Sequence, residues 1–474
     1  MLLLDEPQRR ALWQRLAEAV EAHVEGVRAL PVAPRLDPGA VRALLAPVDF
    51  ETPLAPLAVL DLTLEGLRRH QVHTTHPAYF GLFNPCPGTL SVVGDALVAA
   101  FNPQIAAWSH SPFAAEVESH VLRAFGRRFG WERSDGVFCS GGAEANHTAL
   151  LCALGRAFPA WLQEGAPALD ARPLAYVSAE AHHSFLKAAR LSGLGLSAVR
   201  AVPVDAALRM DVGALRALLR EDRRAGHAPF LLVATAGTTS AGAVDPIAAL
   251  ATVAAEERLW LHVDAAWGGA AVLDPDTAPL FAGSDRADSL TIDAHKWLSV
   301  PMGAGMFITR HEEVLERTFR VAAAYMPREA EGLDIMDPYA HSMQWSRRAI
   351  GMKLFLSLAA AGWEGYAEAV RTMNGLGRAL GQRLHAAGWE AVNDTALPLV
   401  CFVDARHPRG GEAAYLQRVA EAVLASGRAW ISTVSLSTGR AALRACITNH
   451  RTTAADLDAL VAALDAARAA AARG

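Results

Sequence analysis

The feature that most constrains the fold of this chain is a series of short apolar segments separated by stretches with helical periodicity. The segments are LAYVS (174–178), FLLVATA (230–236), RLWLHVD (258–264), SLTID (289–293) and AGMFIT (304–309). Strands that are apolar throughout are buried on both faces, which is typical of a parallel sheet covered by helices. The sequence therefore predicts an α/β fold with a mostly parallel sheet. The short link between the last two segments predicts one antiparallel neighbour.

Three regions with different patterns follow one another along the 474 residues. Residues 1–75 have the pattern of helices separated by proline-rich turns. Residues 76–365 hold the alternation of strands and helices. Residues 366–474 have the pattern of helices with two or three strands, which predicts a second, smaller α/β domain. A chain of this length is long enough for one large and one small domain.

Composition excludes several classes of function. The net charge is only −5 at pH 7 and no Lys/Arg run stands out, so nucleic acid and anionic membranes are not expected partners. No run of eighteen apolar residues occurs, which argues against a membrane span. The five cysteines form no CxxC pair, which argues against a disulfide framework or a metal site. The N-terminus lacks a signal-peptide pattern, and we expect a cytoplasmic protein.

Lys296 is one of only three lysines in a chain rich in arginine, and it closely follows a predicted strand. Lysine differs from arginine because it can lose its proton and attack a carbonyl. Asp264 ends another predicted strand, and His182 and Thr238 follow two more. Ligands of such sheets bind at the carboxyl ends of the strands, so we expect these side chains to lie together.

Each of these residues has an ordinary structural explanation when taken alone, such as a helix cap, a tight turn or an ion pair. Together they match a site for pyridoxal 5′-phosphate. Lys296 would hold the cofactor aldehyde as a Schiff base, and Asp264 would pair with the pyridine N–H and keep the ring an electron sink. Gly142 and Ala143, at the start of a predicted helix, would offer backbone donors to the phosphate. His182 would stack on the ring.

The stretch from His76 to about Lys353 resembles the group II pyridoxal-phosphate-dependent amino-acid decarboxylases. That family includes the aromatic-L-amino-acid, histidine and glutamate decarboxylases, and its fold is fold type I (aspartate-aminotransferase-like). The motifs that carry the resemblance are HPAYFGLFNP, AAWSHSPFAAEVE, SGGAEAN, AHHS, ATAGTTSAGAVDPI, HVDAAWGG and DAHKW. HVDAAWGG combined with DAHKW is the most specific pair. The resemblance implies an enzyme that converts an L-amino acid to the amine and CO₂.

The resemblance also implies roles for further residues. His295 would lie near the cofactor beside Lys296. Ala266 would pack on the ring opposite His182, and Thr238 would lie near the phenolic oxygen of the cofactor.

Family members carry a mobile loop with a tyrosine that protonates the substrate carbon after CO₂ leaves. The loop here would be YMPREAEGLDIMDPYAHSMQWSRR, and Tyr339 is the predicted proton donor, with Tyr325 and a packing role for Tyr339 as alternatives. Arg347 is expected to support the site rather than touch substrate.

Phe83, Asn84 and Trp108 are the predicted substrate-binding residues. Phe83 and Trp108 favour a flat apolar side chain, whereas Asn84 could bind a polar one. Neither FGLFNP nor WSHSP contains an Arg or Lys for a distal carboxylate, so an aromatic L-amino acid is favoured over an acidic one. The chain also departs from the aromatic decarboxylases, because Asp293 stands where they usually have Asn and Trp267 where they have Tyr.

The fold implies a homodimer with shared active sites, in which residues near Gln104, Ile105 and Trp108 reach the neighbouring cofactor. Other outcomes of the same site are oxidative deamination to an aldehyde, Cα–Cβ cleavage, or a catalytically silent paralogue that binds the cofactor. A nucleotide-binding α/β protein is disfavoured because neither GxGxxG nor GxxxxGK[ST] occurs.

Overall fold

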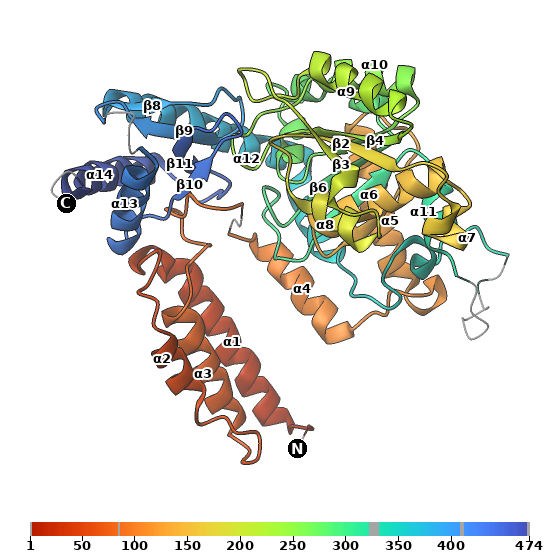
Figure 1. The fold of residues 1–474 in the computed structure, drawn as a ribbon. Helices are drawn as coiled ribbons and strands as arrows, with labels where there is room; N and C mark the ends of the chain where they lie inside the picture. Colours follow the sequence, from red (N-terminus) through yellow and green to blue (C-terminus); the bar gives the residue numbers. More distant parts are fainter. Residues whose placement is uncertain (1, 84–85, 322–329, 331, 408–411, 472–474) are drawn as a thin grey trace.

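The computed structural model describes residues 2–83, 86–321, 330, 332–407 and 412–471 (Figure 1). Its large sheet has the strand order β1-β7-β6-β5-β4-β2-β3. The strands are β1 (Asp135–Cys139), β2 (Pro173–Ser178), β3 (Val199–Val202), β4 (Ala228–Thr235), β5 (Trp260–Asp264), β6 (Ser289–Asp293) and β7 (Gly305–Thr309). Strands β2 to β6 pair in parallel, and β7 is antiparallel to both β6 and β1. The predicted fold class, including an antiparallel neighbour, is confirmed.

Helices cover both faces of this sheet, which explains why its strands are apolar throughout. The helices that pack against its strands are α5 (Pro112–Arg128), α6 (Gly142–Ala157), α8 (Ser184–Leu191), α9 (Val212–Arg224) and α10 (Ile247–Glu257). Helices α4 (Thr89–Phe101), α7 (Trp161–Glu164) and α11 (Val314–Phe319) pack mainly against other helices. Successive side chains of β4 pack into two different hydrophobic clusters. Leu231 and Val233 belong to one cluster, and Leu232 and Ala234 belong to the other. Both faces of β4 are therefore buried.

The carboxyl ends of the three central strands lie at the same edge of the sheet, where β4 and β5 end level and β6 extends two residues further. Thr235 at the end of β4 pairs with Asp264 at the end of β5, and Asp264 pairs with Thr291 of β6. This register brings the residues that follow the three strands to one edge of the sheet, where the predicted site lies.

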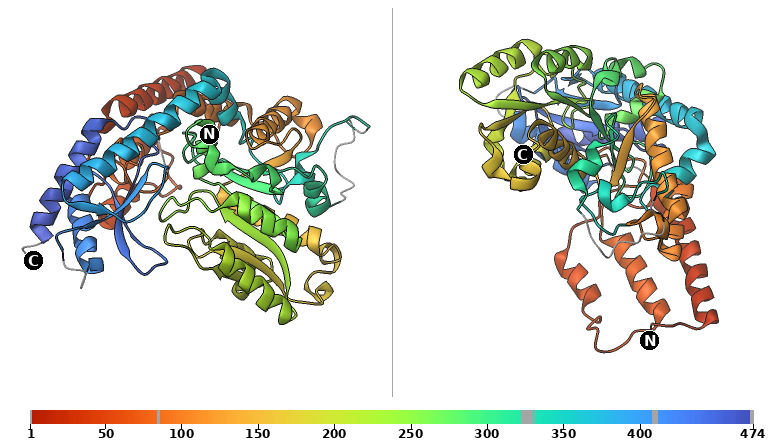
Figure 2. Two further views of the ribbon diagram at one scale, coloured as in Figure 1. Left: turned by 90° about the horizontal axis from the view of Figure 1, so that it is seen from above. Right: turned by 90° about the vertical axis from the view of Figure 1, so that its right-hand side faces the viewer.

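The N-terminal helices form an arm that projects from the rest of the chain (Figures 1 and 2). They are α1 (Glu6–Gly26), α2 (Pro38–Leu45) and α3 (Pro56–Arg69), and α2 and α3 begin with proline, as the sequence pattern predicts. None of the three helices contains a buried residue. Among the helices of the described residues, none is both long and apolar enough to cross a membrane.

A smaller antiparallel sheet lies at the C-terminal side, with the order β10-β11-β9-β8. Its elements are β8 (Trp389–Ala391), β9 (Leu399–Asp404), β10 (Ser432–Ser435), β11 (Ala441–Cys446), α13 (Glu412–Ala425) and α14 (Ala454–Ala471). The sequence pattern predicted two or three strands here; the short β8, whose three residues carry little pattern, was missed.

Helix α12 (Met352–Ala386) connects the large sheet to the small one (Figure 2). Its regular conformation is interrupted at Gly362, where φ is 63°. The expected domain boundary at residue 365 therefore falls within this helix, just after the interruption. Phe80 also links the first of these two regions to the C-terminal one that holds the small sheet, because its N–H donates to Trp430 O and its carbonyl accepts from Cys446 N.

Candidate active site

Asp264 lies at the end of β5 and is only 4% exposed. Its Oδ2 accepts a hydrogen bond from Asn146 Nδ2 at 2.8 Å, and its Oδ1 accepts one from Ala266 N at 3.1 Å. Within the described part of the chain, Asp264 makes no ion pair. A buried carboxylate without a cationic partner is costly, so this position suits a ligand that brings a positively charged N–H.

A buried relay of polar groups fixes the orientation of Asn146. Its Oδ1 accepts from His262 Nε2 at 3.2 Å, and the other ring nitrogen of His262 is 2.8 Å from Ser289 Oγ. Burial lowers the pKa of His262 to about 3, so the ring is neutral at neutral pH. Because Asn146 Oδ1 must accept, its amide N–H groups are directed at Asp264 and Ser184.

Lys296 follows β6 in a tight turn and forms an ion pair with Asp293. Its Nζ lies 2.8 Å from Asp293 Oδ2, with the lysine side chain 24% exposed and the aspartate side chain 2%. Lys296 lines the same pocket as Asp264. Lys296, the predicted nucleophile, and Asp264, the buried carboxylate at the end of β5, are thus brought together in one pocket.

The start of α6 forms a cradle of backbone donors. The N–H groups of Gly142 and Ala143 have no hydrogen-bond partner among the described residues, and the N-terminus of a helix favours an anion. A Cβ on Gly142 would lie 2.7 Å from Asp293 Oδ2 and 3.2 Å from Ala266 Cβ. Any larger residue there would have to displace the carboxylate of Asp293.

The pocket that joins these groups brings together six of the predicted residues. Its lining consists of Gly142, Ala143, Asn146, His182, Thr235, Gly237, Thr239, Asp264, Ala266, Trp267 and Lys296. An amine, an unpaired buried carboxylate, free helix N–H groups and the exposed ring of His182 are the groups that pyridoxal phosphate requires. The residues present therefore fit this cofactor.

Two predicted cofactor residues lie outside this lining. Thr238 is fully buried and its hydroxyl accepts from Ala243 N at 3.1 Å, and its neighbour Thr239 lines the pocket instead. His295 lies behind Lys296, where its Nδ1 accepts from Ala304 N at 3.0 Å. Burial lowers the pKa of His295, so it serves as a neutral acceptor that holds the turn.

Tyr339 belongs to a 3₁₀ turn, Pro338–His341, and does not line this pocket in its own chain. Its ring packs 4.9 Å from that of Trp345, and its N–H donates to Ala106 O at 3.0 Å. Tyr325 and Asn84 lie outside the described residues.

The expected supporting role of Arg347 has a clear geometric basis. Its Nη2 is 2.7 Å from Glu118 Oε2, and both side chains are 4% exposed. The backbone of Arg347 also forms a bridge with Ile105. Arg347 thus joins the end of the predicted loop to α5 and to the segment before α5.

Of the predicted substrate residues, Phe83 forms an aromatic wall with Trp267 of the pocket lining, whereas Trp108 does not line the pocket. Phe83 stacks on Trp267, with ring centroids 4.5 Å apart and 14° between the planes. Trp108 is half-buried, and its indole N–H donates to Glu116 Oε1. Trp267, which replaces the tyrosine of the aromatic decarboxylases, is therefore covered on one face by Phe83, and both residues are buried.

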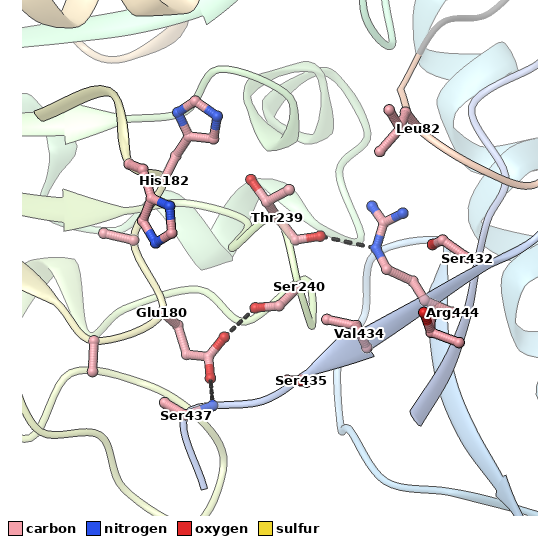
Figure 3. A pocket seen from close by; sticks show the side chains of 14 residues that line it. Leu82, Glu180, His182, Thr239, Ser240, Ser432, Val434, Ser435, Ser437 and Arg444 are labelled. Carbon is pink, nitrogen blue, oxygen red and sulfur yellow. Dashed lines mark hydrogen bonds between the residues drawn. The ribbon is translucent and has the colours of Figure 1, made fainter. Parts of the chain in front are cut away.

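A second cavity of about 380 Å³ adjoins the first and shares His182 and Thr239 with it (Figure 3). Arg444 of β11 lines this second cavity, and it was not among the site residues predicted from the sequence. Arg444 is 3% exposed, donates from Nε to Thr239 O and from Nη1 to Gly81 O, and lies 4.7 Å above the ring of Phe83. Its Nη2 has no partner among the described residues. The sequence signal that could have identified Arg444 is an arginine within the mostly apolar segment ALRACIT.

Glu180 lies on another side of the same cavity (Figure 3). Its carboxylate accepts from Ser240 Oγ and, at 2.5 Å, from Ser437 N. Because Ser437 belongs to the turn between β10 and β11, Glu180 links the large sheet to the small one at the edge of the site.

Known proteins resemble this chain in sequence and in fold. The family model described as "Pyridoxal-dependent decarboxylase conserved domain" matches residues 40–404. A tyrosine decarboxylase of Oryza sativa subsp. japonica is 32% identical over 85% of this chain and 77% of that protein. An L-2,4-diaminobutyrate decarboxylase of Rhizobium meliloti is 33% identical over 81% and 76% of the two chains. The crystal structure of Oryza sativa TDC with PLP and tryptamine has the same fold, with a TM-score of 0.91, 24% identity and coverage of 99% of each chain.

Proposed function

This chain belongs to the pyridoxal-dependent decarboxylases, and from that membership we propose that it removes the α-carboxylate of an aromatic L-amino acid. The products would be the aromatic amine and CO₂. The observation that carries the choice of substrate is the aromatic wall of Phe83 and Trp267 beside a single buried guanidinium, that of Arg444.

Five of the lining residues have a task in this proposal. Bound pyridoxal phosphate supplies a ring that takes up the electron pair of the breaking bond. Lys296 holds the aldehyde carbon of the cofactor, and Asp264, oriented by Asn146, keeps the ring nitrogen protonated. Gly142 and Ala143 bind the phosphate through their free N–H groups.

The charges of the two pockets favour an aromatic substrate over an acidic one. Every amino acid has an α-carboxylate, and we propose that Arg444 binds it, because its buried Nη2 has no partner among the described residues. Besides Lys296, Arg444 is the only Lys or Arg in the linings of these two cavities, and these linings are drawn from the described residues. A carboxylate in the substrate side chain would therefore lack a cationic partner there, and burying it would be unfavourable.

The test is to incubate the purified protein and pyridoxal phosphate with a panel of L-amino acids and to identify products by mass spectrometry. The panel contains Trp, Tyr, Phe, His, Glu, Asp and 2,4-diaminobutyrate, with Lys296→Ala as the control. We expect an amine from an aromatic substrate that is absent in the control. An amine only from Glu, Asp or diaminobutyrate would overturn the substrate class. An aldehyde would indicate oxidative deamination, and no product from a cofactor-loaded protein would indicate a silent paralogue.

The enzyme is proposed to act as a homodimer with shared sites. Helix α4 exposes an apolar stripe on one face, formed by Leu90, Val93, Leu97 and Phe101, and the N-terminal arm leaves its apolar side chains uncovered. Such faces mark association surfaces. Two segments expected to act across the interface also lie together, because Trp108 N donates to Asp337 Oδ1 and Tyr339 N to Ala106 O.

Tyr339→Phe is expected to lower amine formation about 10²-fold, the effect of losing a general acid. Tyr325→Phe is the matched control and is expected to stay near the wild-type rate. Because Tyr339 does not line its own chain's pocket, we expect it to act in the neighbouring site. Mixing Tyr339→Phe with Lys296→Ala subunits should then restore part of the activity, since one site of each mixed dimer has both residues. Normal turnover by Tyr339→Phe, or by a monomer in sedimentation, would contradict this assignment.

A further inference from the structure

We propose that Asp293 is a positioning residue that holds the ammonium group of Lys296 whenever this lysine is not bonded to the cofactor. The carboxylate would thereby keep the amine engaged and unreactive until the cofactor arrives. The inference uses from the proposed function only the role of Lys296, and its test requires no turnover.

The backbone fixes the direction of the Asp293 carboxylate. Asp293 ends β6, pairs with Gly305 across to β7, and donates its N–H to Ala266 O at 2.7 Å. Its own carbonyl accepts from Lys296 N at 3.1 Å, which closes the turn between the two residues. The turn directs both side chains to the same side, and Nζ meets Oδ2 at 2.8 Å. This contact is short for an ion pair and is set by rigid elements.

Lys296 is the principal charge partner of Asp293. Asp293 is 3% exposed, and its Oδ1 has no hydrogen-bond partner among the described residues. Among those residues, the one other base within 4 Å is His295, whose Nε2 is 3.9 Å from Oδ2. Burial lowers the pKa of His295, so it remains neutral. Loss of Lys296 as partner would leave a buried carboxylate unpaired, which is strongly unfavourable.

This pairing has a chemical consequence for the amine. An ammonium group has no lone pair with which to attack an aldehyde, and one held at 2.8 Å by a buried carboxylate must also leave this partner before it can react. Before Lys296 can bond to the cofactor, its ammonium must give up a proton, and the nearest acceptor in the pocket is Oδ2 of the same Asp293. The structure thus places the group that restrains the lysine where it can also accept this proton.

The first experiment measures the reactivity of Lys296 in the protein freed of cofactor. Limited acetylation at pH 7.5, followed by peptide mass spectrometry, gives separate rates for the three lysines. Lys187 is exposed and Lys353 is 2% exposed, so they provide a fast and a slow internal reference. In Asp293→Asn, which keeps the side-chain size, we expect the acetylation rate of Lys296 to rise about ten-fold relative to Lys187.

The second experiment measures how fast the cofactor-free protein bonds to an aldehyde, from the visible absorbance. Two probes are needed, since Asp293 also lies beside the phosphate cradle, 2.7 Å from a Cβ built on Gly142. With pyridoxal, which lacks the phosphate, Asp293→Asn should react several-fold faster than wild type at pH 7.5.

Asp95→Asn is the matched control, because Asp95 is the acidic partner of a different lysine, Lys353, at 3.3 Å. It should leave the Lys296 rates unchanged. Unchanged or slower acetylation of Lys296 in a folded Asp293→Asn protein would overturn the proposal. So would an acceleration seen with pyridoxal phosphate but not with pyridoxal, since that would mean that Asp293 acts only by repelling the phosphate. Either failure would leave the proposed decarboxylation untouched.

Discussion

Replacing Lys296 by arginine is expected to reduce decarboxylation by at least about 10³-fold while the protein remains folded. Arginine keeps the positive charge that faces Asp293 Oδ2 at 2.8 Å, so the buried carboxylate keeps a partner. It cannot lose its proton and so cannot bond to the cofactor aldehyde. The variant therefore separates the charge of Lys296 from its chemistry, which an alanine substitution cannot do.

The measurement combines amine formation with a direct test of the covalent bond. After reduction with borohydride, the peptide that contains residue 296 should carry the mass of the cofactor in the wild type and not in the variant. Lys187→Arg is the matched control, since Lys187 is an exposed lysine of α8, and it should behave like the wild type. Substantial turnover by Lys296→Arg would assign the aldehyde to another amine and overturn the site.

Replacing Arg444 by methionine is expected to raise KM for the amino acid about 10- to 10²-fold. A hydrogen bond to a charged group contributes about 1.5–3 kcal/mol, and a tenfold change corresponds to about 1.4 kcal/mol. The free Nη2 of Arg444 is the donor that this substitution removes. Methionine has a flexible apolar side chain that can pack against Phe83 in place of the guanidinium.

Binding of the product amine distinguishes recognition of the carboxylate from general damage. Arg444 also holds Thr239 O and Gly81 O, so its loss could loosen the pocket as a whole. The amine lacks a carboxylate, and its affinity should change little in Arg444→Met, while that of the amino acid falls. Arg444→Lys keeps a charge and should recover part of the loss. Equal losses for amine and amino acid would contradict the assignment.

The residues that follow the strands could be predicted from the sequence because their positions depend on local pattern and sheet register. Once the segments ending at Asp264 and Asp293 are identified as parallel strands, their ends meet at one edge. The pocket then contains Lys296, Asp264 and His182 together. The glycine at position 142 could be predicted for the same reason, since it marks a strand-to-helix turn.

Other parts of the site depend on contacts that local pattern does not encode. Arg444 reaches the pocket from the small sheet, and no pattern near Asp264 or Lys296 indicates which distant strand will face them. The choice between Thr238 and Thr239 depends on the turn at Gly237, whose φ of 99° decides which hydroxyl points inward. The break in α12 at Gly362 was likewise hidden, because the helical pattern continues across it.

The buried relay behind Asp264 limits how a sequence of this kind can diverge. The side chains of Ser289, His262 and Asn146 are hydrogen-bonded in series, and Asn146 is hydrogen-bonded in turn to Asp264. A single substitution within the relay leaves a buried donor or acceptor unmatched, at about 1–3 kcal/mol each. Compensated pairs of changes should therefore be tolerated more readily than single ones. We expect these positions to covary among related sequences. Paired replacements would then reveal which side chains of the site are hydrogen-bonded to one another.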